Sequence, residues 1–239
     1  MKKTALSLAA LLVAITLLQI TAGAQSKEVG IVAHRGFWNC EEAGYAENSI
    51  AALRCAQEAG FRGSEFKDFR LKNGETIPTI DEYLQQGRKH PQTMLVYEMK
   101  RHSSAEVEDR FIELTIDKLK EHDLLYPEKV MFISFSYHIC RRMAQLLPGF
   151  TVQYLGSEKS PSKVRKGGVN GINYNYRILN LSPRWVRNAR RLGMSTNAWT
   201  VNNEESMKKM LRMGIDYLTT DNPVMARNLL SKEGYIELK

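Results

Sequence analysis

The chain has 239 residues, of which 43% are hydrophobic, and its formal net charge is +8 at pH 7. This length is enough to bury the core of one full domain. Two of the positive charges, Lys2 and Lys3, lie at the extreme N-terminus, and no dense basic run with interleaved aromatic residues occurs, so the composition argues against a nucleic-acid partner. Three cysteines are too few and too irregularly spaced for a disulfide framework or a zinc site.

The first 24 residues have the layout of a cleavable secretory signal. Lys2 and Lys3 precede an apolar run, and the small residues Ala22-Gly23-Ala24 form an Ala-x-Ala site just before Gln25. A membrane anchor is the weaker interpretation, because the apolar run is short and no basic flank follows it. We therefore expect an exported protein, periplasmic or secreted, with a mature domain over residues 25–239 and no stable membrane anchor after cleavage.

Short apolar strands alternate with helices along the rest of the chain. Capping residues begin the helices between them: Asn48 or Ser49, Thr79, Ser104, Ser182 and Asn203. Eight such units predict an α/β fold, a (β/α)₈ TIM barrel in one domain, in which functional residues follow the carboxyl ends of the strands. The expected strands are Gly30–His34, Arg62–Phe66, Thr93–Met99, Val130–Phe135, Thr151–Leu155, Gly171–Tyr174, Ser195–Thr200 and Tyr217–Thr220.

Polar residues at these strand ends are the candidates for chemistry. His34 and Arg35 end the first strand, and an imidazole beside a guanidinium suits proton transfer next to a phosphate. Glu65 and Glu98 follow buried runs, where an unpaired carboxylate is costly, and a hard divalent cation is a natural partner for both. Lys100 shares the strand face of Glu98.

Several segments of the chain, in the same order, resemble the glycerophosphodiester phosphodiesterase family. The resemblance covers essentially all of the expected mature domain, and its segments are IVAHRG, AENSIAALRCAQEAGFRGSEF, LVYEMK and NAWTVNNEESMKKMLRMGIDYLTTDNP. It implies a TIM barrel that hydrolyses small-molecule glycerophosphodiesters, from phospholipid head groups, to glycerol 3-phosphate and an alcohol with Ca²⁺ or Mg²⁺.

The resemblance also implies roles for individual residues. His34 resembles the catalytic acid/base, and Glu65 and Glu98 resemble metal ligands. The residues implied to bind substrate or phosphate are Arg35, Lys100 and Trp199, and Glu47 and Asn48 match a Glu-Asn pair near the site. For Trp199, core packing is the alternative. For Asp221, the preferred interpretation is a loop cap.

One departure from the family follows the second strand. Where the family has Glu-x-Asp, this chain has Lys67 two residues after Glu65, and the segment with the second catalytic histidine is missing. Because an ammonium replaces a carboxylate, we expect either weak metal binding or Lys67 in the place of the metal between Glu65 and Glu98. Asp68 could substitute as a ligand only if a bulge turned it inward. Candidates for the lost histidine are His90, His102 and His138. Two functions stay open: an active phosphodiesterase with a reduced site, and an inactive barrel that binds phosphorylated polyols.

Overall fold

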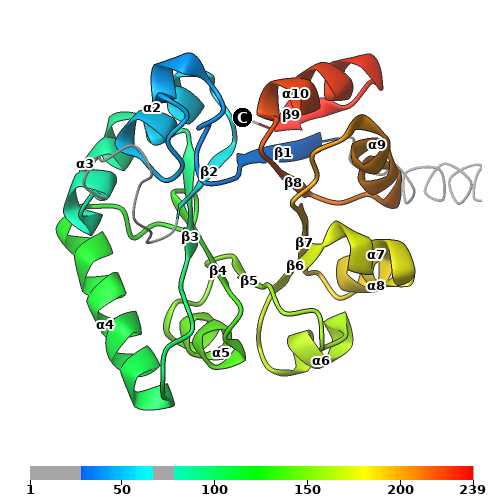
Figure 1. Cartoon of the computed structure of the whole chain (residues 1–239). Coiled ribbons are helices and arrows are strands. Elements are labelled where there is room, and N and C mark those ends of the chain that lie inside the picture. The colour runs from blue at the N-terminus through cyan, green and yellow to red at the C-terminus, as the bar shows by residue number, and fades with distance from the viewer. Residues whose placement is uncertain (1–27, 67–77, 239) are drawn as a thin grey trace, which may run out of the picture.

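The computed structural model describes residues 28–66 and 78–238 of the chain. Eight parallel strands form a closed barrel surrounded by helices, and a ninth strand extends the sheet, so the predicted fold is confirmed (Figure 1). The strands are β1 (Glu28–Ala33), β2 (Gly63–Phe66), β3 (Met94–Glu98), β4 (Val130–Ser134), β5 (Val152–Tyr154), β6 (Gly171–Asn175), β7 (Ser195–Trp199), β8 (Tyr217–Thr220) and β9 (Ile236–Leu238).

Strand β1 closes the barrel and also carries the additional strand. Its second half pairs with β2 through Val32 and Ala33, and β8 runs along its other edge. The first half of β1 instead pairs with β9, in parallel, from Glu28 to Gly30. This last strand was not predicted, because a three-residue segment with a glutamate at its centre carries little strand signal.

Helices follow the strands and cover the outside of the barrel. Ser49, Thr79, Ser104 and Asn203 cap helices as predicted, and Thr79 forms a complete capping box with Glu82. The helices are α2 (Ile50–Glu58), α3 (Ile80–Lys89), α4 (Ala105–Glu121), α5 (Tyr137–Leu146), α6 (Pro161–Lys166), α7 (Tyr176–Leu181), α8 (Arg184–Arg191), α9 (Glu204–Met213) and α10 (Pro223–Lys232), with a 3₁₀ turn, η1, at Glu41–Ala43.

The prediction that Ser182 caps a helix was wrong. Ser182 instead ends α7, its backbone N–H being bonded to the carbonyls of Ile178 and Leu179. Pro183 occupies the N-cap position of α8 and makes no side-chain cap hydrogen bond. The physical reason is that β6 runs directly into α7, a short helix with no loop signal before it, so the serine belongs to the end of that helix.

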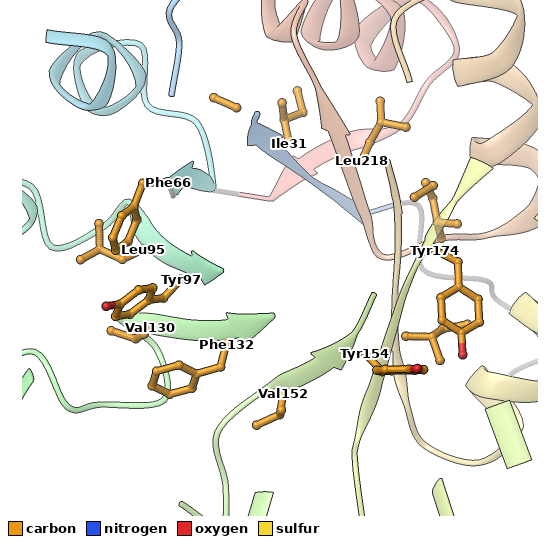
Figure 2. Close-up of a cluster of buried hydrophobic side chains, with 14 of the residues drawn as sticks. Ile31, Phe66, Leu95, Tyr97, Val130, Phe132, Val152, Tyr154, Tyr174 and Leu218 are labelled. Atoms are coloured by element: carbon orange, nitrogen blue, oxygen red, sulfur yellow. The ribbon is translucent and has the colours of Figure 1, made fainter. Parts of the chain in front are cut away.

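Alternation along the strands separates two apolar layers. Val32, Val96, Met131, Ile133 and Leu155 fill the barrel interior. The alternate residues point outward and pack beneath the helices, as Figure 2 shows for Ile31, Leu95, Phe132, Val152 and Leu218. The barrel is therefore a packed core, and polar side chains gather at the carboxyl ends of its strands.

Some predictions fall on parts of the chain outside the description. These are the signal segment, residues 1–24, and the connection after β2, which contains Lys67 and where the sequence predicts a missing segment. Within the described ranges, no helix is long and apolar enough to cross a membrane.

Candidate active site

The strand register places the predicted acidic residues on the inner face of the barrel. Glu65 in β2 lies opposite Val96 in β3, and Val96 fills the barrel interior. Glu98 lies two residues beyond Val96, so it shares the inward face one layer nearer the carboxyl end. Both carboxylates are buried. They therefore lie at neighbouring positions of the barrel mouth, as predicted.

His34 lies between two carboxylates. Its Nδ1 is 2.6 Å from Asp221 Oδ1, and its Nε2 is 3.7 Å from Glu65 Oε1. The backbone N–H of His34 donates to the carbonyl of Thr220, which joins the end of β1 to the end of β8 and brings Asp221 alongside. The ring is therefore held by one nitrogen while the other faces the barrel interior.

Asp221 is the centre of a hydrogen-bond network, so its role is larger than the loop cap we had expected. Asn202 donates to Oδ2 at 2.6 Å, and the indole of Trp38 donates to Oδ1 at 3.4 Å. Burial on its own raises the pKa of Asp221, but the hydrogen bonds from His34, Asn202 and Trp38 outweigh burial, and the pKa lies below its ordinary value. Asp221 is thus a carboxylate at neutral pH.

Arg35 lies in the connection between β1 and α2, in a left-handed conformation with φ of 57°. Its guanidinium forms an ion pair with Glu47, and its carbonyl accepts a hydrogen bond from the N–H of Asn48 at 2.8 Å. The Nε of Arg35 is buried and has no hydrogen-bond partner among the described residues. One donor of this guanidinium is therefore left for an anionic ligand.

Lys100 extends over the mouth from the end of β3. Its Nζ lies 2.6 Å from Glu98 Oε1, and 39% of its side chain is exposed. Both residues line a cavity of about 560 Å³ whose other walls are mostly apolar: Asn48, Phe66, Pro78, Thr79, Ile80, Tyr83, Tyr97, His102, Phe111, Leu114, Thr115 and Lys118. The ammonium of Lys100 thus lies between the buried carboxylate of Glu98 and the cavity.

Trp199 ends β7 on the opposite side of the mouth. Its indole N–H donates to the carbonyl of Asn173 at 2.9 Å, and the ring of Phe135 meets its ring edge-on. The residue is half-buried rather than enclosed in the core. Its ring therefore borders the site while its polar atom is already used within the barrel.

Residues 63–225 match the model of the glycerophosphoryl diester phosphodiesterase family. This chain belongs to that family. The match covers the sites of Glu65, Glu98, Lys100, Trp199 and Asp221. The family assignment makes the chain a phosphoric diester hydrolase of the glycerophosphodiester phosphodiesterase type.

Individual relatives support the family assignment. A glycerophosphodiester phosphodiesterase of Caldanaerobacter subterraneus subsp. tengcongensis is 24% identical, over 85% of this chain and 98% of its own length. The crystal structure of a glycerophosphodiester phosphodiesterase from Parabacteroides distasonis is 30% identical with a TM-score of 0.82, over 88% of this chain and all of that one. An Oleispira antarctica phosphodiesterase in complex with sn-glycerol-3-phosphate shares the fold, with a TM-score of 0.68 at 19% identity over 84% of this chain and 96% of that one.

Members of the family generally use a divalent metal ion. Glu65 and Glu98 supply oxygen donors of the right kind. However, Lys100 is bonded to Glu98, and no group of three or more His, Cys, Asp or Glu side chains that could hold an ion occurs in residues 28–66 and 78–238. The described residues alone therefore do not fit a complete divalent-cation site.

The three candidates for a second catalytic histidine are placed differently. His138 is bonded to Asp109 at 2.9 Å, between α4 and α5. His90 is the C-cap of α3. Only His102 lines the same cavity as Glu98 and Lys100, where its ring meets Phe111 edge-on. His102 is therefore the candidate that lies beside Glu98 and Lys100, in a cavity whose walls do not include His34 or Asp221.

Asp221, Asn202 and Trp38 are the site residues that sequence reasoning undervalued or missed. One signal was available for Asp221: it stands two residues after Thr219, whose hydroxyl donates inward to Asn197 at 3.0 Å. Alternation thus places the Asp221 carboxylate at the mouth. Asn202 and Trp38 come from loops, where no sequence periodicity indicates which way a side chain points.

Proposed function

We propose that this family member is an active, exported enzyme that hydrolyses glycerophosphodiesters to glycerol 3-phosphate and an alcohol. The observation that carries the proposal is the arrangement of His34, held at Nδ1 by Asp221 and facing Glu65 through Nε2 at the mouth of the barrel. An imidazole oriented by a carboxylate is suited to general acid/base catalysis.

The hydrogen bond to Asp221 assigns the tautomer of His34. A neutral imidazole that donates from Nδ1 has its lone pair at Nε2. That nitrogen can accept the proton of the substrate's glycerol hydroxyl as its oxygen attacks phosphorus, while the P–O bond to the alcohol breaks and a cyclic glycerol phosphate forms. The departing alcohol takes its proton from solvent at the mouth. Water then attacks phosphorus and releases a proton to solvent, the imidazolium returns its proton to the ring oxygen that leaves, and glycerol 3-phosphate is the product. Asp221, already ionised, stabilises the imidazolium that forms.

Cationic side chains would bind the phosphate at this mouth. Lys100 supplies an ammonium at the edge of the cavity, and Arg35 has a buried Nε available. Charge on the phosphoryl oxygens grows as the attacking bond forms, so fixed positive groups stabilise the transition state. Trp199 would form an aromatic wall against the glycerol. The complex of the Oleispira antarctica relative with sn-glycerol-3-phosphate supports a phosphorylated glycerol as ligand.

Export follows from the signal-like segment at residues 1–24. The enzyme would then act on small glycerophosphodiesters in the periplasm or outside the cell. Expression of the full chain in a Gram-negative host tests this part, and N-terminal sequencing of the exported protein is expected to begin at Gln25.

Hydrolysis of glycerophosphocholine tests the activity. The purified mature chain, assayed with and without added Ca²⁺ or Mg²⁺, is expected to release glycerol 3-phosphate. The variant His34→Ala should lose activity by about 10²–10⁴-fold. The matched control is His138→Ala, a half-exposed imidazole bonded to Asp109, which should leave activity unchanged.

Two results would contradict the proposal. Turnover that survives His34→Ala would remove His34 from the reaction. A folded wild-type chain that binds glycerol 3-phosphate without hydrolysing the diester would instead support the inactive barrel that binds phosphorylated polyols.

A further inference from the structure

The positive charge of this protein is concentrated in one stretch. Residues 159–203 contain nine lysines and arginines and no aspartate or glutamate, whereas the whole chain has a net charge of +8. All other residues together therefore have a net charge of −1. A localised excess of this kind indicates an anionic partner, while an even spread would serve solubility alone.

The structure places most of these cations on the surface of adjacent helices. Seven of them are exposed, and none of the seven forms an ion pair with another described residue. We call this set the basic sector: Lys163, Arg165 and Lys166 on α6, Arg177 on α7, and Arg184, Arg187 and Arg191 on α8. The helix α4, on the other side of the barrel, differs in this respect. Its cations form ion pairs with carboxylates of the same helix, as in Arg110–Glu113 and Lys120–Asp117.

The helices of the basic sector lie next to one another (Figure 1). Asn188 of α8 donates to the hydroxyl of Ser162 of α6 at 2.9 Å, which fixes the two helices against each other. Within α8, residues 184, 187 and 191 repeat at helical spacing and share one side. Figure 1 shows α7 and α8 side by side with α6 next to them, on the far side of the barrel from α3 and α4.

An apolar side chain stands at the edge of this face. Leu181, the last residue of α7, is 81% exposed, the highest value among the exposed large hydrophobic residues of the described chain. Arg177 and Arg184 lie within four residues of it on either side. Because α7 follows directly after β6, Leu181 lies near the carboxyl ends of the strands, the end where His34 and Asp221 meet.

We propose that the basic sector is a docking surface for an anionic phospholipid membrane, with Leu181 inserting among the head groups. Exposed lysines and arginines beside an exposed leucine combine the two attractions that hold a peripheral protein at such a surface, namely charge and apolar burial. The face is built on the outer sides of helices, which suits an extended lipid surface. Docking there would also bring the end of the barrel that holds the site close to the head groups.

Vesicle sedimentation tests the proposal without requiring any activity. The mature chain should bind large vesicles of phosphatidylcholine with about 30% phosphatidylglycerol, and should bind pure phosphatidylcholine vesicles far more weakly. The triple variant Lys163→Gln/Arg184→Gln/Arg187→Gln should bind the anionic vesicles on the order of 100-fold more weakly, at about fivefold for each removed charge. Leu181→Ser should lower binding several-fold, and this loss should persist at high salt.

The matched control removes three exposed cations from the opposite side of the barrel. Arg88→Gln/Arg110→Gln/Lys120→Gln changes the net charge equally and should retain the wild-type affinity for vesicles. Equal loss in both triple variants would overturn the proposal, because net charge alone would then explain binding. Equal binding of wild type to neutral and anionic vesicles would also overturn it, as would binding to a short DNA duplex without binding to vesicles. Unchanged thermal melting shows that each variant is folded.

Discussion

The pair formed by His34 and Asp221 is the part of the site that single substitutions test most directly. Asp221→Asn keeps the size of the side chain but can donate to His34 Nδ1 and so favour the wrong tautomer. We expect kcat to fall by about 10²–10⁴-fold with little change in KM, as expected for an orienting carboxylate. The measurement is steady-state hydrolysis of glycerophosphocholine. Asp117→Asn on the exposed side of α4 is the control, and an equal loss in both variants would contradict the assignment.

Because the pKa of Asp221 is lowered, the stability that its carboxylate contributes depends on pH in a definite direction. The folded-state pKa lies below the ordinary value, so the contribution of the carboxylate to stability is complete above the ordinary pKa of about 3.9 and is lost as pH falls through the folded value. Denaturant titrations should therefore show a stability difference between wild type and Asp221→Asn that is constant near neutrality and shrinks in acid. A difference that grows in acid would contradict the sign.

Glu65 and Glu98 lead to a prediction about metal binding. The described residues contribute two carboxylates, one of them bonded to Lys100, so few ligand charges remain for a cation. We expect titration calorimetry to give a dissociation constant for Ca²⁺ of about 10⁻⁴ M or higher. In the variant Glu65→Gln, the heat of Ca²⁺ binding should disappear. Glu113→Gln, in an exposed ion pair, is the control. Tight binding of Ca²⁺ by the wild-type chain would contradict this expectation.

The β1–α2 connection holds Arg35 and Asn48, and Gly36 sets its course. Gly36 has φ of 83°, and a Cβ there would lie 2.6 Å from the Cβ of Ala52 in α2. Gly36→Ala should therefore combine backbone strain with a clash and destabilise the protein by about 2–4 kcal/mol. Gly44→Ala is a matched control, because its φ is 58° but nothing lies within 4 Å of the added Cβ, and about 1 kcal/mol is expected. Urea denaturation measures both. Equal losses would contradict the steric argument.

Elements with a clear hydrophobic period were predictable, and short connecting elements were not. All eight barrel strands overlap the segments where the sequence placed them, because each is a short, largely buried run of three to six residues between turn signals. Alternation then placed His34, Glu65 and Glu98 at one mouth. By contrast, α7 has six residues and begins directly after β6, so no loop signal separates it from the strand. The role of Asp221 depends on the pairing of β8 with β1, a contact between the two ends of the chain that no local pattern encodes.

Strand β9 joins the last described residues of the chain to β1, the strand that His34 directly follows. Glu237 of β9 accepts two hydrogen bonds from Arg227 of α10, at 2.7 and 2.8 Å, and the guanidinium stacks over Phe61 at 4.3 Å. The carboxylate is largely buried, with 12% of its side chain exposed. The two hydrogen bonds between Arg227 and Glu237 therefore fix β9 against α10, while β9 pairs with the first half of β1 (Figure 1).

Loss of the paired hydrogen bonds between Arg227 and Glu237 should loosen the attachment of β9 to β1. Glu237→Gln leaves the guanidinium near Phe61 without its carboxylate, and we expect a loss of about 1–3 kcal/mol in the free energy of unfolding. Glu113→Gln, which breaks the exposed pair with Arg110, should cost less than about 0.5 kcal/mol. Urea denaturation gives both values. Hydrogen exchange should also rise in the first half of β1 for Glu237→Gln, because that half pairs with β9. Unchanged exchange there, with reduced overall stability, would show that the fork stabilises α10 without fixing β9 to β1.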